Sequence, residues 1–215
     1  MKNFLVFGAT GSIGEECVKA LNPLGTVIQG SRDYEQLLGR IDEIAFYDAV
    51  IWAQGLNTSD SIDDFDSSNY QNVLEANLTF LINSANWLIK NKKTNKPCQF
   101  IVISSVWSQI ARPNKLTYSI TKAAVGAAVR SMAVDLGPIG TQVNSISPGP
   151  LESPMTKQNL TSDQIAMLIQ QSPLKRLVKL SEIGEIVSHF ANGEMSGITG
   201  QDIIVDGGWS VSKLV

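Results

Sequence analysis

The sequence predicts a doubly wound α/β fold, in which helices cover both faces of one parallel sheet. Short apolar runs alternate with longer segments of helical periodicity along the 215 residues, and this alternation is typical of βαβ units. A glycine-rich turn follows the first apolar run. Such a turn is expected at the carboxyl ends of the strands, where ligand crevices of these sheets lie. The length predicts a single domain over residues 1–215.

The elements are expected in alternating order, with right-handed crossovers between parallel strands. The segment over residues 34–46 has Leu37, Leu38, Ile41 and Ile44 at helical spacing. The segment over residues 118–136 is rich in alanine. Apolar runs predict strands over residues 4–7, 26–29, 49–53, 99–104, 142–146 and 202–205. Helical spacing predicts helices over residues 13–21, 34–46, 70–89, 118–136, 161–171 and 181–191.

Composition and charge exclude several classes of protein. A net charge of −3 gives no electrostatic reason to expect nucleic acid or an anionic membrane as a partner. No apolar run reaches the roughly 20 residues of a membrane-spanning helix. Cys17 and Cys98 are too few for a disulfide framework or a metal cluster, so we expect structural thiols, no metal, and a cytoplasmic location.

The turn after the first strand is the segment Gly8-Ala9-Thr10-Gly11-Ser12-Ile13-Gly14. Glycines let a backbone approach a pyrophosphate, and the N-terminus of the following helix offers free N–H groups and a positive dipole end. The turn therefore predicts a dinucleotide site. The alternative is a tight turn whose glycines serve geometry alone.

The second predicted strand ends in Gly30-Ser31-Arg32-Asp33. An arginine at this position accommodates the 2′-phosphate of NADP, whereas an acidic residue binds the ribose hydroxyls of NAD. Arg32 favours NADP as the cofactor, and Ser31 beside it is a further candidate for cofactor binding. Asp33 keeps NAD as an alternative, and Arg32 could also be an ordinary solvated side chain.

Ser105, Tyr118 and Lys122 form a pattern suited to proton transfer at a carbonyl group. Tyr118 and Lys122 are four residues apart, so a helix places them on one face. A neighbouring ammonium favours the phenolate and lowers the pKa of a tyrosine. A serine hydroxyl at the end of a strand can hold the carbonyl oxygen by a hydrogen bond. Taken alone, the tyrosine–lysine pair is common in helices and is only weak evidence for catalysis.

Together these segments resemble the short-chain dehydrogenase/reductase family over nearly the whole length. Asn77 in Glu75-Ala76-Asn77-Leu78 and the segments 143–149 and 197–208 stand in the order and approximate spacing of that family. Residues 153–209 look most like its 3-oxoacyl-carrier-protein reductase branch. The resemblance implies a three-layer Rossmann-type fold and an NAD(P)(H)-dependent oxidoreductase acting on a small carbonyl compound or alcohol.

The resemblance also implies a role for each matching residue. Tyr118 would exchange the proton and Ser105 would orient the carbonyl. Lys122 would lower the pKa of Tyr118 and hold the nicotinamide ribose, and Asn77 would anchor a water in a proton relay. The remaining cofactor contacts would come from Gly8, Thr10, Gly11, Ser12, Ile13, Gly14, Ala53, Gln54, Gly55, Pro148, Gly149, Leu151 and Ser153.

Two further features are implied by the family. The segment at about 150–175 would form a mobile substrate lid. The helices at 70–89 and 118–136 would form the seam of a homodimer or homotetramer.

The chain departs from the family at the adenine side. Ser12 stands where the family usually has the middle glycine, and Trp52-Ala53-Gln54-Gly55 replaces Asn-Asn-Ala-Gly. Only one helix fits between the second strand and residue 49, so we expect the usual third strand to be missing and six strands to remain in the order 2-1-4-5-6-7 by the family's numbering. These departures leave open a non-catalytic nucleotide sensor or scaffold on the same fold.

Three more side chains bear on the substrate. Trp107 either walls the substrate pocket or packs under its loop. Arg112 could contact an acidic substrate, although a solvated surface arginine is the more common case. His189 is the only histidine and lies far from the tyrosine in sequence, so we expect a structural role.

Overall fold

The computed structural model describes residues 1–30 and 46–212. Its main sheet has six strands in the order β2-β1-β3-β4-β5-β8, and every neighbouring pair is parallel. The strands are β1 (Lys2–Phe7), β2 (Gly25–Gly30), β3 (Tyr47–Trp52), β4 (Thr94–Ile103), β5 (Thr141–Pro148) and β8 (Asp202–Val205). This confirms the predicted doubly wound parallel sheet.

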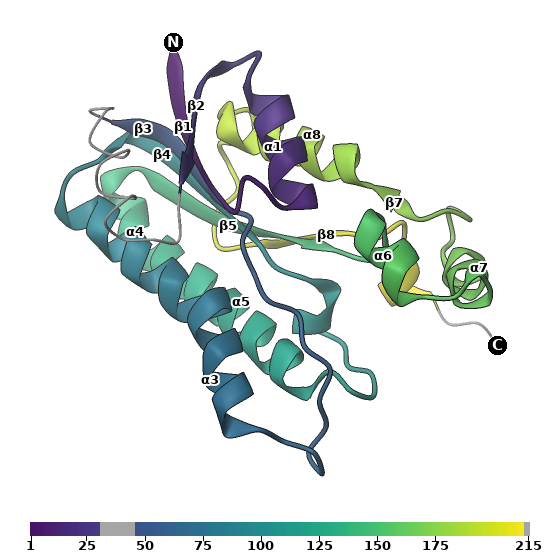
Figure 1. Cartoon of the computed structure of the whole chain (residues 1–215). Helices are drawn as coiled ribbons and strands as arrows, with labels where there is room; N and C mark the ends of the chain where they lie inside the picture. The colour runs from purple at the N-terminus through teal and green to yellow at the C-terminus, as the bar shows by residue number, and fades with distance from the viewer. Residues whose placement is uncertain (31–45, 213–215) are drawn as a thin grey trace.

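Helices cover both faces of this sheet and complete three layers (Figure 1). On one face α1 (Ser12–Leu21) packs against α8 (Leu180–Ala191). On the other lie α3 (Ser67–Leu74), α4 (Phe80–Lys90) and α5 (Leu116–Leu136).

Strand β1 shows why the sheet is buried on both sides. Phe4 and Val6 belong to the apolar cluster under α1 and α8. Leu5 and Phe7 belong to the cluster under α4 and α5, because successive side chains of a strand point to opposite faces. A continuous apolar run is therefore what a strand between two helical layers requires.

Trp52 at the end of β3 has no exposed surface and packs edge-on against Phe100, with ring centroids 4.9 Å apart. Its indole nitrogen donates a hydrogen bond to Ser84 Oγ of α4 at 2.8 Å. Residue Ala53 follows, and its backbone N–H donates to the carbonyl of Phe7 at 2.9 Å. The strand end is thus braced by an indole and by backbone, where the family has an asparagine amide.

The predicted helix over residues 70–89 is not continuous. A π-helical turn, η1 (Glu75–Thr79), separates α3 from α4. Such single turns are rare in helices and are often found at functional sites. Asn77 lies at its centre and is buried, so the interruption falls on a predicted site residue.

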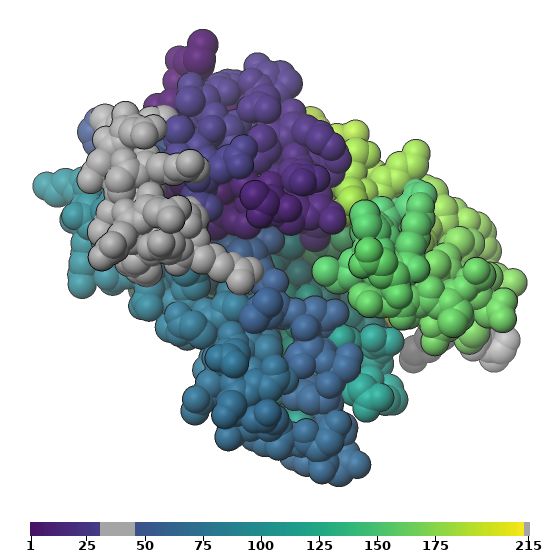
Figure 2. All heavy atoms as spheres, viewed as in Figure 1, coloured from purple at the N-terminus to yellow at the C-terminus, as the bar shows by residue number. Residues whose placement is uncertain are grey.

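A small lobe stands beside the sheet. Strands β6 (Leu151–Glu152) and β7 (Val178–Lys179) form a second, two-stranded parallel sheet. Helices α6 (Pro154–Asn159) and α7 (Ser162–Gln171) lie between them in sequence and form the green lobe of Figures 1 and 2. The sequence predicted α7 but missed α6 and both short strands. No residue of α7 is buried.

The observed order equals the predicted 2-1-4-5-6-7, since β3, β4, β5 and β8 take the places of the family's fourth to seventh strands. In the described part of the chain, β2 is one edge strand of the sheet and β8 is the other. The predicted helix over residues 34–46 falls outside the described residues except for residue 46, so the absence of the family's third strand stays a prediction.

Candidate active site

A cavity of about 360 Å³ opens at the carboxyl ends of β1, β3, β4 and β5. This is the end of the sheet at which the fold is expected to bind ligands. The turns after these strands and the start of the small lobe supply its walls. Those backbone segments include Gly11, Ser12, Ile13, Ala53, Gln54, Gly55, Ile103, Ser104, Ser105, Pro148, Gly149, Leu151 and Ser153.

The glycine turn shapes one wall. Gly8 has a φ of +73°, a conformation that favours glycine. A Cβ on Gly14 would lie 2.0 Å from the carbonyl oxygen of Gly8, so only glycine lets α1 start this close to β1. Gly11 precedes α1 without any side-chain cap. The first N–H groups of α1 therefore remain available beside the cavity, where Gly11, Ser12 and Ile13 line it, while Thr10 is exposed in the turn.

Ser105 and Tyr118 meet in the cavity wall. Ser105 follows β4, and its Oγ accepts a weak hydrogen bond from the backbone of Trp107 at 3.3 Å. Tyr118 lies in the first turn of α5 and shares a hydrogen bond with Ser105. Burial raises the pKa of Tyr118, and the hydrogen bond with Ser105 opposes that rise. The phenol is therefore held in its protonated form, as a donor, at neutral pH.

Lys122 lies one turn further along α5. Its Nζ is 5.7 Å from the centroid of the Tyr118 ring and donates to the carbonyl of Ile103 at 2.9 Å. Burial lowers the pKa of Lys122 to about 8. Burial is the largest influence on the pKa of Tyr118, and the expected lowering of that pKa by Lys122 stays a prediction.

Asn77 uses its amide inside the protein. Its Oδ1 accepts from the backbone N–H of Leu56 at 2.7 Å, and its Nδ2 donates to the carbonyl of Leu56 and to Thr121 Oγ1, each at 3.0 Å. The side chain thus clamps the loop after β3 to α5. A Cβ on Gly55 would lie 3.1 Å from Asn77 Oδ1 and 3.6 Å from Lys122 Nζ, so a glycine keeps this corner open.

The turn after β5 borders the lobe. The N–H of Gly149 donates to the carbonyl of Val205 at 3.0 Å, and a Cβ there would lie 2.4 Å from Asp206 Cβ. The hydroxyl of Ser153 accepts from the N–H of Thr156 at 3.1 Å and caps α6. Pro148 and Leu151 also line the cavity. The structure therefore brings these predicted residues to the site, while Ser31 and Arg32 lie outside the described residues.

Trp107 was expected either to wall the substrate pocket or to pack under its loop, and it lies in the wall of the cavity. It lines the cavity and packs edge-on against Trp209, with ring centroids 5.6 Å apart. His189 is half exposed on α8, pairs with Glu194, and does not line this cavity. Cys17 and Cys98 are buried free thiols, as expected.

Sequence reasoning missed two residues that hold the start of α5. Asp60, from the loop after β3, accepts from the N–H of Thr117 at 3.1 Å. Lys115 donates to Asn57 Oδ1 at 2.5 Å and to the carbonyl of Thr58 at 2.8 Å. Sequence spacing carried no signal for these contacts, because they join residues 57 and 58 positions apart in the chain.

Residues 1–30 and 46–212 contain neither a metal-binding cluster nor a membrane-spanning helix. No group of three or more His, Cys, Asp or Glu side chains there could hold a metal ion. None of the helices there combines the length and the apolar composition that a membrane span requires.

A family model of short-chain dehydrogenases/reductases, described as enoyl-(acyl carrier protein) reductase, matches residues 27–210. The chain therefore belongs to the short-chain dehydrogenase/reductase family. This match covers most of the chain and includes every element around the cavity except β1, the glycine turn and α1.

The matches with individual relatives cover only part of the length of those proteins. The chain is 28% identical to cyclopentanol dehydrogenase of Comamonas testosteroni, over 77% of this chain and 66% of that protein. It is 32% identical to a 3-oxoacyl-[acyl-carrier-protein] reductase of Buchnera aphidicola, over 66% of this chain and 58% of that protein. The chain thus spans less than two thirds of the length of these relatives.

Solved structures share the whole fold. The ligand-free aldohexose dehydrogenase of Thermoplasma acidophilum has a TM-score of 0.90 at 22% identity, covering 100% of this chain and 96% of that one. A gluconate 5-dehydrogenase of Burkholderia cenocepacia, solved with NADP and tartrate, has a TM-score of 0.87 at 21% identity, covering 99% and 96%.

The residues present fit a dinucleotide. The uncapped start of α1 offers N–H donors. Gly11 has open space beside it, because a Cβ at this position would lie near only one atom, the carbonyl oxygen of Gly8, at 3.5 Å. Two buried polar atoms of the cavity wall, Gln54 Oε1 and Ser104 Oγ, have no hydrogen-bond partner among the described residues. Phosphate and hydroxyl groups of a nucleotide are suited to such partners.

Proposed function

We propose that this protein is an NAD(P)(H)-dependent oxidoreductase that interconverts a carbonyl group and an alcohol on a small molecule. The observation that carries the proposal is the meeting of Ser105, Tyr118 and Lys122 in one cavity with the glycine turn at its other wall. A non-catalytic nucleotide sensor would need the glycine turn but not a paired serine and tyrosine aimed into the cavity.

The nicotinamide cofactor would supply or take up the hydride, so the protein needs only to position the carbonyl and exchange one proton. Ser105 Oγ holds the carbonyl oxygen. Tyr118, kept protonated by burial, donates its proton to that oxygen as charge develops on it. Lys122 places a positive charge beside the phenolate that remains, and Asn77 keeps the loop after β3 against α5.

The start of α1 would bind the pyrophosphate. Gln54 Oε1 and Ser104 Oγ would bond hydroxyl groups of the cofactor. The turn at Pro148, Gly149 and Leu151 would border the nicotinamide, and Ser153 would keep the lid helix α6 beside it.

We infer a preference for NADP(H) over NAD(H) from Arg32 in the sequence. A comparison of the two reduced cofactors in one assay tests this preference. We also propose one domain with a lid at about 150–175, a cytoplasmic location, and a homodimer or homotetramer.

Replacing Tyr118 by Phe tests the proposed mechanism. It removes the proton donor and keeps the ring, so turnover of carbonyl substrates should fall by about 10²-fold or more. The affinity for reduced cofactor, measured by fluorescence titration, should remain within about twofold. Tyr70→Phe, at a tyrosine of α3 that does not line the cavity, is the matched control and should keep full activity.

A Tyr118→Phe protein with near-normal turnover would contradict the mechanism. Tight cofactor binding by the wild type, with no turnover of any carbonyl compound, would instead support the sensor.

A further inference from the structure

The charged lining of the cavity has a single sign. Among the described residues that line it, the charged side chains are Arg112, Lys115 and Lys122, and none is acidic. The whole chain has the opposite balance, with 20 acidic and 17 basic residues. The positive lining is therefore local to the cavity.

Lys115 is buried and makes no ion pair with the described residues. Only 4% of its surface is exposed, and its Nζ bonds to two neutral oxygens, Asn57 Oδ1 and the Thr58 carbonyl. No carboxylate of the described residues lies within ion-pair distance of it. An ammonium group has three N–H donors, so one donor remains for a ligand. The same Nζ is 5.5 Å from the Tyr118 ring centroid, close to the proposed reaction centre.

Arg112 presents an unoccupied guanidinium at the same wall. Its guanidinium carbon lies 5.3 Å from the centroid of the Trp107 ring, and Trp107 is held by Trp209. Within residues 1–30 and 46–212, no hydrogen bond or ion pair engages this guanidinium. Burial is the main cause that lowers the pKa of Lys115, the positive charge of Arg112 adds to it, and the carboxylate of Asp60 opposes it. The two cations of the cavity wall therefore repel each other.

We propose that Arg112 and Lys115 form an anion subsite and that the substrate is an oxo acid or the corresponding hydroxy acid. Its carboxylate would bind this subsite while its carbonyl oxygen lies at Ser105 and Tyr118. This inference rests on the proposed function. A guanidinium fork matches a carboxylate with two parallel hydrogen bonds, and an anion between the two cations relieves their repulsion. A neutral substrate would leave the Arg112 guanidinium without an anionic partner.

Matched pairs of an acid and its methyl ester test the subsite: pyruvate, acetoacetate and levulinate, each against its ester. The wild type should show a kcat/KM at least about tenfold higher for one acid than for its ester. In Arg112→Met, kcat/KM for that acid should fall by about 10- to 100-fold, the usual range for a charge-assisted hydrogen bond. The ester should change by less than about threefold, and the acid's KM in the wild type should rise with salt.

Controls separate charge from folding. Lys90→Met removes an exposed cation at the end of α4, outside the cavity, and should leave the preference for the acid unchanged. The affinity for reduced cofactor should be normal in Arg112→Met, which shows that the cavity is intact.

Three results would overturn the inference. If the wild type reduces esters as well as acids, or if Arg112→Met loses both equally, the subsite is wrong and the proposed function stands. If no carbonyl compound is reduced and neither cofactor binds, the proposed function itself fails, and the anion subsite with it.

Discussion

Lys122 shows, at the scale of one residue, how a site that suits catalysis lowers stability. The side chain is 4% exposed and has one hydrogen bond, to the Ile103 carbonyl. A pKa lowered from 10.5 to about 8 corresponds to about 3 kcal/mol of preference for the neutral amine. At neutral pH the folded protein nevertheless carries the charged form. Such an arrangement is expected where the charge serves a function.

Lys122→Met should therefore stabilise the fold at pH 7 while it impairs turnover. Met keeps most of the length of the side chain, although the Ile103 carbonyl loses its donor at a cost of about 1 kcal/mol. The net gain should be about 1–2 kcal/mol in the free energy of unfolding, measured by urea denaturation.

The pH dependence of this gain has a defined sign. Below pH 8 Lys122 is protonated in both states, so the whole cost is present. Between pH 8 and 10.5 the unfolded chain binds the proton and the folded chain does not, so wild-type stability rises with pH. The gap between variant and wild type should shrink from pH 7 to pH 10. A variant less stable than the wild type at pH 7 would show that the buried charge is well compensated.

Sequence spacing was informative for residues that act through local geometry. Tyr118 and Lys122 are one helical turn apart, and Ser105 follows a strand, so their meeting could be predicted. Lys115 could not, because its placement depends on Asn57 and Thr58 in a loop more than 50 residues earlier in the chain. The raised pKa of Tyr118 was missed for a similar reason, since it depends on burial by several elements.

At the scale of elements, short irregular pieces carry the site and escape periodicity. The π-helical turn η1 puts Asn77 against Leu56 and Thr121, yet its sequence continues a helical pattern. Helix α6 and strands β6 and β7 have too few residues to show a period of their own. Long elements were predicted to within a few residues, as for α5, whose observed start at Leu116 is two residues before the predicted one.

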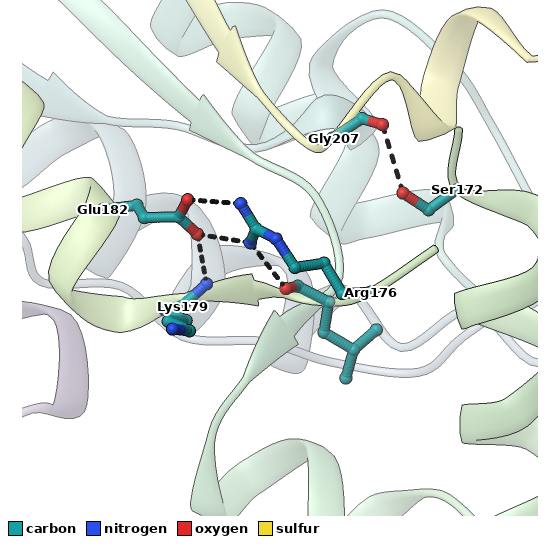
Figure 3. A network of polar contacts seen from close by, with 6 residues as sticks. Ser172, Arg176, Lys179, Glu182 and Gly207 are labelled. Carbon is teal, nitrogen blue, oxygen red and sulfur yellow. Dashed lines mark hydrogen bonds and ion pairs between the residues drawn. The ribbon is translucent and has the colours of Figure 1, made fainter. Parts of the chain in front are cut away.

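A partly exposed ion pair between Arg176 and Glu182 ties the small lobe to the first turn of α8 (Figure 3). Both terminal nitrogens of Arg176 donate to the Glu182 carboxylate at 2.6 and 2.7 Å, and the backbone N–H of Lys179 donates to it at 2.8 Å. Ser172 adds a hydrogen bond to the Gly207 carbonyl at 3.1 Å. The hydrogen bond from Arg176 lowers the pKa of Glu182 to about 2.

Glu182→Gln should loosen the carboxyl end of the lobe. The pair is partly exposed and screened by solvent, so the loss in the free energy of unfolding at pH 7 should be only about 0.5–1 kcal/mol. Trypsin should cleave faster after Lys175 and Arg176 in the variant. The charge contributes stability above pH 4.5, and this is lost as pH falls through about 2, so the difference should narrow in acid. Glu185→Gln on the same helix is the control, and equal effects would contradict a specific tie.

At the scale of the molecule, the alternation of apolar runs and helical segments was enough to predict a parallel sheet between two helical layers. That inference succeeds because a strand covered on both faces must be apolar throughout, as Phe4–Phe7 is. The cavity follows from the same topology, because the loops after parallel strands all leave at one edge. Its positive lining does not follow, because it combines residues from α5 and from the loop before it.

Helix α5 presents an exposed apolar surface that is suited to assembly of two copies of the chain. Ile120 is 43% exposed and Val134 is 76% exposed, with exposed Ala123 and Ala127 between them on the same helical stripe. Ile82 of α4 is 46% exposed as well. Apolar side chains gathered in this way, with small ones between them, allow two helices to approach closely.

We expect a dimer or tetramer at micromolar concentration, measured by light scattering coupled to size exclusion. Ala127→Glu should weaken dimerisation at least tenfold, because a twofold axis through the stripe would bring the new carboxylate near its own copy. Ala166→Glu adds the same charge to the exposed face of α7 and should leave the mass unchanged. A wild-type monomer at this concentration would refute the seam. An Ala127→Glu protein that remains fully dimeric would show that the copies meet through another face.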